Sequence, residues 1–343
     1  MTARTPFLLK PCGKDYLWGG SRLNDDFNLG LDSDPLAEAW VCSTHPDGSS
    51  SVADDPTTSN TQGKQGTQGT ADLKELLEAD PTLLGTHALT LTGGKAELPI
   101  LIKLIDAKKD LSVQVHPDDE YARVHENGSL GKTEFWYVLD ARPDSSLIYG
   151  FNRDVDESLV RSSIDNGSIS TLLNTVPIHK NDVFMINPGT VHAIGTGALI
   201  AEIQESSNIT YRLYDYDRVD RDGNKRPLHI DRALDIANLK SSTAPRQPMR
   251  VLKYRPGFAT ELLTRCKYFI VERMLLNTEN RTLARYQTGS NSFHALLITD
   301  GCGNISTDDG FSLNFFKGDC IFVPADSGKL YLHGRAQILD VSC

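Results

Sequence analysis

Short runs of apolar or alternating residues, separated by turn-forming residues, recur along the chain and dominate it after residue 248. They cover residues 99–105, 111–116, 135–139, 268–275, 293–298, 311–316, 320–324 and 330–333. Runs of about four to eight residues rich in β-branched and aromatic side chains are typical of the strands of β-sandwiches and barrels. Helical patterns are fewer and cover residues 71–79, 118–125, 155–164 and 228–237. We therefore predict a mainly β chain with helical excursions in its first two thirds.

The length of the chain, 343 residues, suggests more than one domain, because chains beyond about 250–300 residues tend to divide. A polar stretch at residues 240–247 follows a predicted helix and precedes the strand-rich tail. We place a domain boundary there, which gives one domain over residues 1–240 and another over 241–343. Residues 55–70 contain no large apolar side chain. We predict a flexible surface loop for them, because burial cannot offset the entropy of ordering such a segment.

The formal net charge of −10 argues against a nucleic-acid partner or an anionic membrane surface, since both attract basic proteins. No apolar run approaches the roughly 18 residues that a membrane-spanning helix needs. The six cysteines are scattered without a Cys-x-x-Cys pair, which favours reduced thiols and a cytoplasmic location. An anionic small molecule is compatible with this composition, provided that its binding site is locally positive.

Alternation in residues 111–116 (LSVQVH) predicts a strand with one apolar and one polar face. Side chains two positions apart share a face, so Ser112, Gln114 and His116 should point the same way. A second predicted strand carries Glu134, and a Pro-Gly turn at residues 188–189 returns the chain so that His192 approaches the other strands.

Gln114, His116, Glu134 and His192 together offer two imidazoles, a carboxylate and a carboxamide. Nitrogen and oxygen donors without a thiolate suit Zn²⁺, Fe²⁺, Mn²⁺ or Co²⁺, and the donor set alone does not choose among these metals. The remaining histidines lie near predicted turns or on helical surfaces without a ligand partner at useful spacing; they are His45, His87, His125, His179, His229, His294 and His333.

Several motifs occur in the order of a known family. They are the opening LLKPCGKDYLWGGSRL and the later runs QVHPDD, GKTEFWYVLDA, NPGTVHAIG and EIQESSNITYRLYDYDR. The chain resembles the short bacterial form of the type I mannose-6-phosphate isomerases, in the cupin superfamily, over roughly residues 6–240. The tail is similar to the second β-barrel of these proteins only loosely. The resemblance implies two cupin-type (jelly-roll) β-barrels with a few helices inserted in the N-terminal part.

The resemblance also implies an activity: the reversible conversion of mannose 6-phosphate to fructose 6-phosphate through an enediol. It implies one zinc ion per chain, held by Gln114, His116, Glu134 and His192, although other divalent transition metals are possible. The metal site would lie in the first barrel and not in the second. The expected partner is a sugar phosphate, and the expected state is a monomer or a weak homo-oligomer.

The same resemblance assigns roles around the expected metal. Lys132 and Arg212 match catalytic positions, and we expect Lys132 to move the proton and Arg212 to hold an oxyanion or the substrate. Lys103 and Ser112 match positions on the substrate side, toward the phosphate, and Asn208 is a third residue that we expect to contact the substrate. Asn208 stands where many relatives carry Asp; an amide cannot accept a proton as a carboxylate does, so a base at this position is in doubt.

Two other functions remain open on the residues alone. A non-haem iron oxygenase would use His116, Glu134 and His192 as its two-histidine, one-carboxylate triad. A non-enzymatic phosphosugar-binding cupin would keep the barrel and dispense with Lys132 and Arg212. Kinase and nucleotide-dehydrogenase functions are disfavoured, because the chain contains neither a Walker A motif nor a Rossmann glycine fingerprint.

Overall fold

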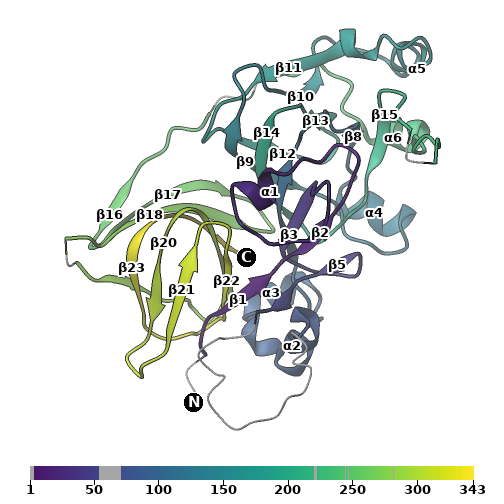
Figure 1. Ribbon diagram of the computed structural model, residues 1–343. Coiled ribbons are helices and arrows are strands. Elements are labelled where there is room, and N and C mark those ends of the chain that lie inside the picture. The colour runs from purple at the N-terminus through teal and green to yellow at the C-terminus, as the bar shows by residue number, and fades with distance from the viewer. Residues whose placement is uncertain (1–3, 54–70, 220–221, 244, 246, 281) are drawn as a thin grey trace.

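The computed structural model describes residues 4–53, 71–219, 222–243, 245, 247–280 and 282–343. The loop predicted at residues 55–70 lies outside the described residues, as do residues 244 and 246 of the predicted boundary. Antiparallel strands in several sheets form most of the regular structure (Figure 1), which confirms the prediction of a mainly β chain. None of the helices in these ranges is long and apolar enough to cross a membrane.

A ten-stranded sheet contains the strands of the C-terminal third (Figure 1, green to yellow). Its path runs β16-β17-β18-β23-β20-β22-β1-β6, while β19 pairs with β23 and β21 pairs with β20. The strands are β1 (Phe7–Lys10), β6 (Ser51–Val52), β16 (Lys253–Arg255), β17 (Phe258–Arg265), β18 (Ile270–Asn277), β19 (Ala284–Tyr286), β20 (His294–Ser306), β21 (Ser312–Phe316), β22 (Cys320–Val323) and β23 (Leu330–Ser342).

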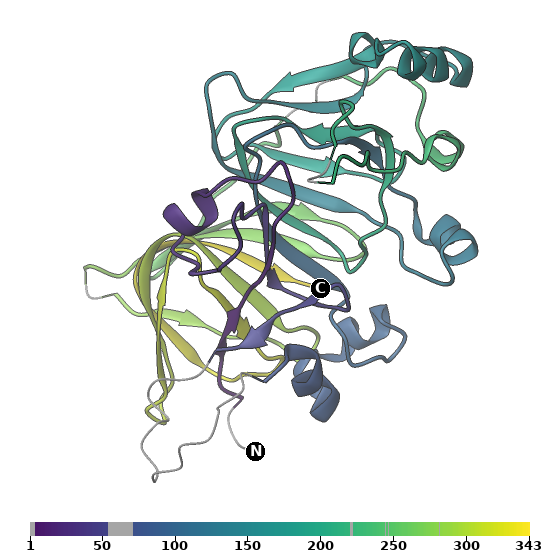
Figure 2. The same ribbon diagram turned by 45° about the vertical axis from the view of Figure 1, so that its right-hand side comes forward.

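Strand pairing crosses the predicted domain boundary. β1 pairs with β22, where Leu8 lies opposite Ile321, and β6 pairs with β1. The purple N-terminal strand accordingly lies beside the yellow-green sheet in both views (Figures 1 and 2). Pairing of β22 by a strand from the other end of the chain covers its backbone groups, which an open edge would leave exposed. A division of the chain at residue 240 stays a prediction.

The N-terminal two thirds form two larger sheets and a hairpin. The six-stranded sheet has the order β12-β9-β14-β7-β3-β2, and the five-stranded sheet has the order β11-β10-β13-β8-β15. The strands are β2 (Cys12–Lys14), β3 (Glu38–Cys42), β7 (Ile100–Asp106), β8 (Val113–Val115), β9 (Glu134–Ala141), β10 (Ser146–Phe151), β11 (Leu173–Pro177), β12 (Val183–Ile186), β13 (His192–Ile194), β14 (Ala198–Glu205) and β15 (Tyr211–Tyr214), with the hairpin β4 (Thr44–His45) and β5 (Gly48–Ser49).

All four predicted helices are present: α2 (Leu73–Ala79), α4 (Asp119–His125), α5 (Glu157–Asp165) and α6 (Ile230–Ile236). Asp72, Asp118 and Asp156 cap the first three of these by accepting a hydrogen bond from a backbone N–H of the first turn. The sequence patterns missed α1 (Arg22–Asp25), α3 (Thr86–Leu91) and the 3₁₀ turns η1 (Pro81–Leu83) and η2 (Ile169–Leu172). These elements are too short to show a helical period.

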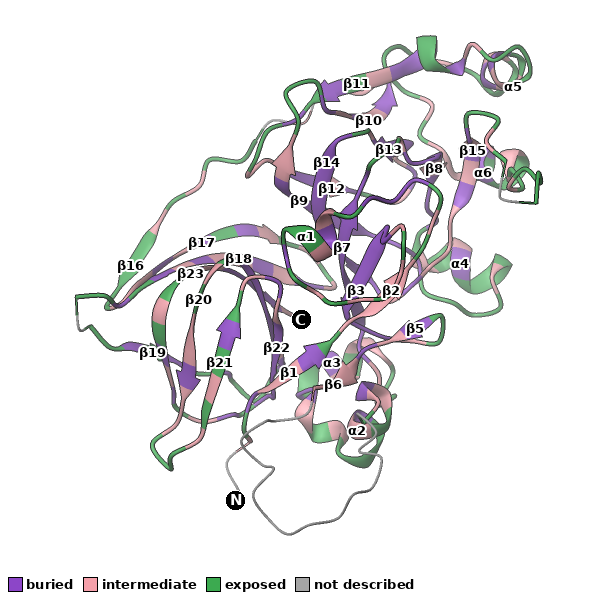
Figure 3. Ribbon diagram, in the orientation of Figure 1, coloured by how far each residue is buried: buried purple, intermediate pink, exposed green. Residues whose placement is uncertain are grey.

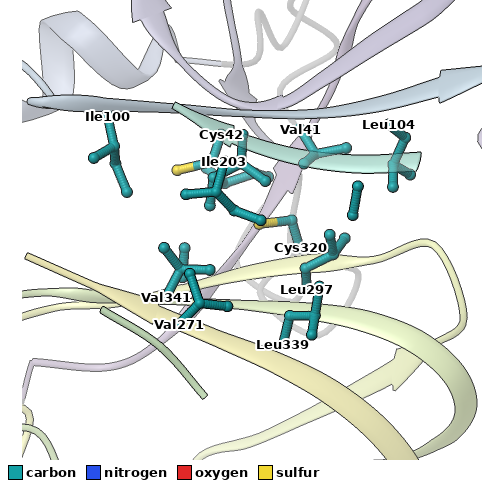
Figure 4. Packing of buried hydrophobic residues seen from close by; sticks show 14 of the residues in the cluster. Val41, Cys42, Ile100, Leu104, Ile203, Val271, Leu297, Cys320, Leu339 and Val341 are labelled. Atoms are coloured by element: carbon teal, nitrogen blue, oxygen red, sulfur yellow. The ribbon is translucent and has the colours of Figure 1, made fainter. Parts of the chain in front are cut away.

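The six-stranded sheet has two buried faces, because its side chains alternate between two layers. One face packs on the ten-stranded sheet: Figure 4 shows Val41, Ile100 and Ile203 opposite Val271 and Leu339. The other face points toward the five-stranded sheet and contributes to a second apolar cluster. Strands β3, β7, β9 and β14 are therefore buried over most of their length (Figure 3). Any polar side chain on the second face must find a partner inside the protein.

Candidate metal centre and active-site cavity

Strand β9 carries Glu134 toward the five-stranded sheet. Phe135 and Tyr137 pack in the cluster shared with the ten-stranded sheet, whereas Trp136 lies in the cluster on the opposite face. Glu134 is on the same side as Trp136, because residues two apart on a strand share a face. Its carboxylate is fully buried, so the strand places a charged group in the protein interior.

The predicted Pro-Gly turn lies between β12 and β13 and brings His192 to the site. Gly189 has a φ of +82°, and its N–H donates to the carbonyl of His116 at 3.0 Å. A Cβ atom at Gly189 would lie only 2.8 Å from the carbonyl oxygen of Ile236, so both the dihedral angle and the space require glycine. β13 then pairs with β8, with His192 directly opposite Gln114.

His116, Glu134 and His192 converge on one point. One ligand atom from each residue lies within 4.8 Å of the others, in a group that could hold a metal ion. The distance from His116 Nε2 to Glu134 Oε1 is 3.3 Å, and that from His192 Nε2 to Glu134 Oε2 is 3.5 Å. All three side chains are buried, at 1% exposure or less.

The protonation of these groups suits a cation. Burial, reinforced by the charge of Lys132, lowers the pKa of His116 to about 3, and burial also lowers the pKa of His192. Both imidazoles are therefore neutral, and each can offer a nitrogen lone pair to a metal ion. His192 Nδ1 lies 2.8 Å from the carbonyl oxygen of Thr190, which fixes the proton on Nδ1 and leaves the Nε2 lone pair free for the site.

Glu134 is ionised although it is buried. Burial alone would raise its pKa, but the charge of Lys132 and the contact with His116 hold the pKa well below its usual value. Among the described residues, no hydrogen bond of good geometry reaches either oxygen, although Lys132 forms an ion pair with Oε1. Two neutral imidazoles facing an unsolvated carboxylate fit a divalent cation such as Zn²⁺ or Fe²⁺.

Gln114 lies at the edge of this group. Its Nε2 is 3.4 Å from His192 Nε2, and its Oε1 is 3.5 Å from the hydroxyl of Ser112. Half a turn of the carboxamide exchanges its oxygen and nitrogen and directs an oxygen donor toward His192. Gln114 can thus supply a fourth ligand, and its position next to Ser112 follows from the shared strand face.

Lys132 contacts two of the three candidate ligands. Its Nζ lies 2.5 Å from Glu134 Oε1 and 3.3 Å from His116 Nε2. The side chain is buried, so its ammonium compensates the carboxylate where water cannot. A cation bound between Glu134 and His116 would compete with this ammonium for the same oxygen.

A cavity of about 120 Å³ lies beside the candidate metal group. All the remaining predicted site residues line it, namely Lys103, Ser112, Gln114, Lys132, Asn208 and Arg212. Sequence patterns did not single out several other lining residues, which include Tyr16, Trp18, Glu38, Glu202 and Arg226. His116, Glu134 and His192 adjoin the cavity through their contacts with Gln114 and Lys132.

Lys103 has acidic partners that its sequence context did not reveal. Its Nζ is 3.1 Å from a carboxylate oxygen of Glu202 and 3.7 Å from one of Glu38. Burial would lower the pKa of Lys103, but these two carboxylates raise it overall. The ammonium of Lys103 is therefore protonated, and the two carboxylates already balance its charge. The signal that could have revealed this pairing is a glutamate inside an otherwise apolar run, in EAWVC and in ALIAEIQE.

Two tryptophans bind the buried charge cluster formed by Lys103, Glu38 and Glu202. Trp40 Nε1 donates to Glu38 and Trp136 Nε1 donates to Glu202, both at 2.7 Å. Across adjacent strands, Trp40 lies opposite Lys103, Lys103 opposite Glu202, and Glu202 opposite Trp136. The indole ring of Trp136 also lies edge-on to His192, with centroids 5.4 Å apart. The cluster therefore connects the cavity lining to His192, a candidate metal ligand.

Two guanidinium groups line the cavity. Burial and the nearby charge of Arg226 lower the pKa of Arg212, whose Nε has no hydrogen-bond partner among the described residues. Arg226 is held by Asp215, which accepts from its Nε at 2.8 Å and its Nη2 at 2.5 Å. Asp215 also binds Arg218. The two arginines therefore supply positive charge to the cavity, and Asp215 offsets part of it.

Comparison with known proteins agrees with this geometry. Residues 7–134 match the family model described as the catalytic domain of type I phosphomannose isomerase. A probable mannose-6-phosphate isomerase of Bacillus subtilis is 41% identical over 337 residues, which cover 97% of this chain and 98% of the relative. The chain belongs to the type I phosphomannose isomerase family.

Comparison with solved structures shows that the chain has the cupin fold of this family. The crystal structure of the mannose 6-phosphate isomerase of Bacillus subtilis has a TM-score of 0.84 and 31% identity, and the match covers 99% of each chain. A mannose 6-phosphate isomerase solved with zinc and yttrium bound shares the fold at 15% identity, with a TM-score of 0.73 over 98% of both chains.

The surroundings of Asn208 are revealed by the structure and not by the sequence. Its Nδ2 donates to Asp47 Oδ2 at 2.9 Å. The amide lines the cavity, and Asp47 lies in the hairpin turn between β4 and β5. A carboxylate is therefore present one hydrogen bond away from the position where a base was in doubt.

Proposed function

We propose that the chain is a metal-dependent aldose–ketose isomerase that interconverts mannose 6-phosphate and fructose 6-phosphate through an enediol. The observation that carries this proposal is the buried group of His116, Glu134 and His192 beside a cavity lined by Lys132 and Arg212, in a chain of this family. The group offers metal donors, and the cavity offers cations for an anionic sugar.

The metal we propose is zinc, one per chain, with His116, Glu134 and His192 as ligands and Gln114 as the fourth. Imidazole and oxygen donors without a thiolate suit this ion, and a relative of the same fold was solved with zinc bound. When bound, such an ion polarises a carbonyl and stabilises negative charge on oxygen. The donor set also accepts other divalent transition metals.

Substrate recognition is assigned to the cations of the cavity. A phosphate monoester carries a charge of about −2 near neutral pH, and guanidinium groups bind phosphate with paired hydrogen bonds. We place the phosphate at Arg212 and Arg226, because the single carboxylate of Asp215 is shared by Arg218 and Arg226 and balances only part of their charge. Lys103, in contrast, is paired with the two carboxylates of Glu38 and Glu202. Lys103, Ser112 and Asn208 then donate hydrogen bonds to sugar oxygens from the cavity wall.

Proton transfer is assigned to Lys132. The conversion moves a hydrogen from C2 of the aldose to C1 of the ketose, and the intermediate carries extra charge on oxygen. Lys132 can hold or release a proton at Nζ, and this atom lies at the junction of the cavity and Glu134. Arg212 keeps its proton, so its role is to hold the substrate through its phosphate.

A coupled assay on mannose 6-phosphate, with metal quantified in the same sample, tests the proposal. Turnover should disappear after chelation and verified metal removal, and added zinc should restore it. Unchanged turnover in metal-free protein would contradict the metal role. An active iron-loaded protein that consumes oxygen without isomerising the sugar would support the oxygenase alternative, and binding without turnover in zinc-loaded protein would support a phosphosugar-binding cupin.

A further inference from the structure

The loop between β17 and β18 of the ten-stranded sheet reaches the N-terminal end of α4. Two loop residues, Lys267 and Tyr268, contact the same carboxylate oxygen there. Asp119 Oδ2 lies 2.9 Å from Lys267 Nζ and 2.7 Å from the hydroxyl of Tyr268. The next residue, Phe269, is 1% exposed in the core between the two sheets. The loop is therefore anchored at its base while its two polar side chains hold Asp119.

The other oxygen of the same carboxylate holds the segment that leads into β9. Asp119 Oδ1 accepts a hydrogen bond from the backbone N–H of Gly131 at 3.1 Å. A Cβ atom at Gly131 would lie 2.4 Å from the carbonyl carbon of Asp118, so this approach of the two backbones needs glycine. The carboxylate thus joins the loop of one sheet to the entrance of a strand in another.

The next two N–H groups of this segment are also bound. The N–H of Lys132 donates to the carbonyl of Pro117 at 2.9 Å, and the N–H of Thr133 donates to Glu205 Oε1 at 2.8 Å. Three consecutive amides are therefore fixed immediately before Glu134. Among these acceptors, the Asp119 carboxylate receives hydrogen bonds from the loop between β17 and β18.

We infer that Asp119 is a positioning residue through which Lys267 and Tyr268 of the C-terminal sheet set the placement of Lys132 and Glu134. Lys132 is one residue from the Gly131 amide, and Glu134 is three residues away. Both side chains act in a buried site where Nζ and Oε1 lie 2.5 Å apart. A small shift of the backbone at Gly131 changes this separation and the direction of the carboxylate. The kinetic consequence, though not the structural one, rests on the proposed function.

The double variant Lys267→Met/Tyr268→Phe tests the inference. It removes both donors to Asp119 Oδ2, leaves the contact of Gly131 with Oδ1 in place, and keeps the aromatic ring and a side chain of similar length. The kcat for mannose 6-phosphate should fall by about tenfold, since misplacement of about 1 Å costs up to about a hundredfold. The KM should stay within about twofold of the parent value, because the double variant leaves Arg212 and Arg226 in place. The visible absorption spectrum of the Co²⁺-loaded protein should also change, because it reports on the ligand arrangement around Glu134.

The matched control is Lys253→Met/Tyr254→Phe, which makes the same two changes at exposed positions of β16. It should reproduce the parent kcat and Co²⁺ spectrum. The single variant Lys267→Arg, which keeps Tyr268, should have the parent kcat and Co²⁺ spectrum, and this result would support a charge contact with Asp119. A double variant indistinguishable from this control in both readouts would overturn the inference. If the parent protein does not isomerise mannose 6-phosphate, the proposed function fails, and the Co²⁺ spectra still decide the positioning role.

Discussion

Lys132 and Glu134 are two positions apart in the sequence, and their charged atoms lie 2.5 Å apart in the buried wall between cavity and candidate metal group. The pair joins the proposed proton carrier to a proposed ligand. A change at Lys132 therefore affects two properties that can be measured separately, turnover and the stability of the metal-free protein.

Lys132→Met should lower kcat by about 10²- to 10⁴-fold, the usual contribution of a positioned acid or base. Metal content should stay near that of the parent, because the ligand atoms are untouched and a competing ammonium is removed. Metal analysis and steady-state kinetics on the same preparation check both points. A kcat close to the parent value would remove Lys132 from proton transfer, and Lys253→Met is the exposed control.

The same variant should be less stable without metal, since it leaves the Glu134 carboxylate buried and unpaired. Breaking a buried ion pair in this way costs about 3–5 kcal/mol. Added zinc should recover more stability in the variant than in the parent, because the ion then replaces the lost ammonium beside Glu134. Urea unfolding with and without zinc measures the difference, and equal zinc stabilisation in both proteins would contradict this explanation.

His116→Ala and His192→Ala should each lose bound metal, because every variant keeps only one imidazole beside Glu134. His87→Ala is the matched control at an exposed position. Metal per chain, measured after gel filtration without added metal, is the readout. Retention of a full equivalent by both site variants would show that the ligand set is wrong. Gln114→Ala should weaken metal binding less than either histidine variant, since its donor is a neutral amide.

Arg226→Met should raise the KM for mannose 6-phosphate by about tenfold or more, because a hydrogen bond to a charged group contributes about 1.5–3 kcal/mol. The fold should persist, since Asp215 keeps its contact with Arg218. Inorganic phosphate should inhibit the variant less strongly than the parent. The exposed Arg285→Met serves as the control. An unchanged KM together with unchanged phosphate inhibition would place the phosphate elsewhere in the cavity.

His294 makes stability depend on pH from within the ten-stranded sheet. Its Nδ1 lies 2.6 Å from Asp340, and the hydroxyl of Tyr286 is 2.8 Å from both residues. Burial alone would lower the pKa of His294, but Asp340 raises it above the ordinary value of 6.5. The folded protein therefore holds a proton that the unfolded chain releases above about pH 6.5, and the free energy of unfolding should fall as pH rises through the folded pKa.

Urea unfolding of the parent and of His294→Gln, from about pH 6 to about pH 9, checks this sign across the range in which a histidine of raised pKa titrates. The difference in unfolding free energy between the two proteins should shrink as the pH rises, because the parent loses its charged pair. Comparison with the variant removes the contributions of other groups, such as Glu205, whose pKa burial raises to about 8. A difference that is constant with pH would show that His294 is not charged.

Much of the local structure could be predicted from short patterns. Period-two alternation predicted the strand around residues 111–116, an apolar run predicted the strand around residues 135–139, and the helical patterns predicted α2, α4, α5 and α6. The Pro-Gly motif predicted the turn at residues 188–189. Each of these features depends on neighbouring residues alone, through backbone geometry and capping, and therefore leaves a signal within a few positions.

The surroundings of the site could not be predicted in this way. Lys103 was expected to face a phosphate, yet it lies between Glu38 and Glu202, which come from two other strands. No sequence pattern predicted that Arg226 lines the cavity, because its position depends on its hydrogen bond to Asp215. The contact between Tyr268 and Asp119 joins residues 149 positions apart.

The sequence by itself determined which side chains share a strand face and which donor types the chain could offer to a metal. Only the tertiary structure decided which charges meet: the ladder of Trp40, Lys103, Glu202 and Trp136 and the pairing of β1 with β22 depend on the register of strands distant in sequence. The reason is physical. Alternation follows from the two-residue repeat of one extended backbone, whereas a buried charge is stabilised by whichever opposite charge the packing of several strands brings within a few ångströms.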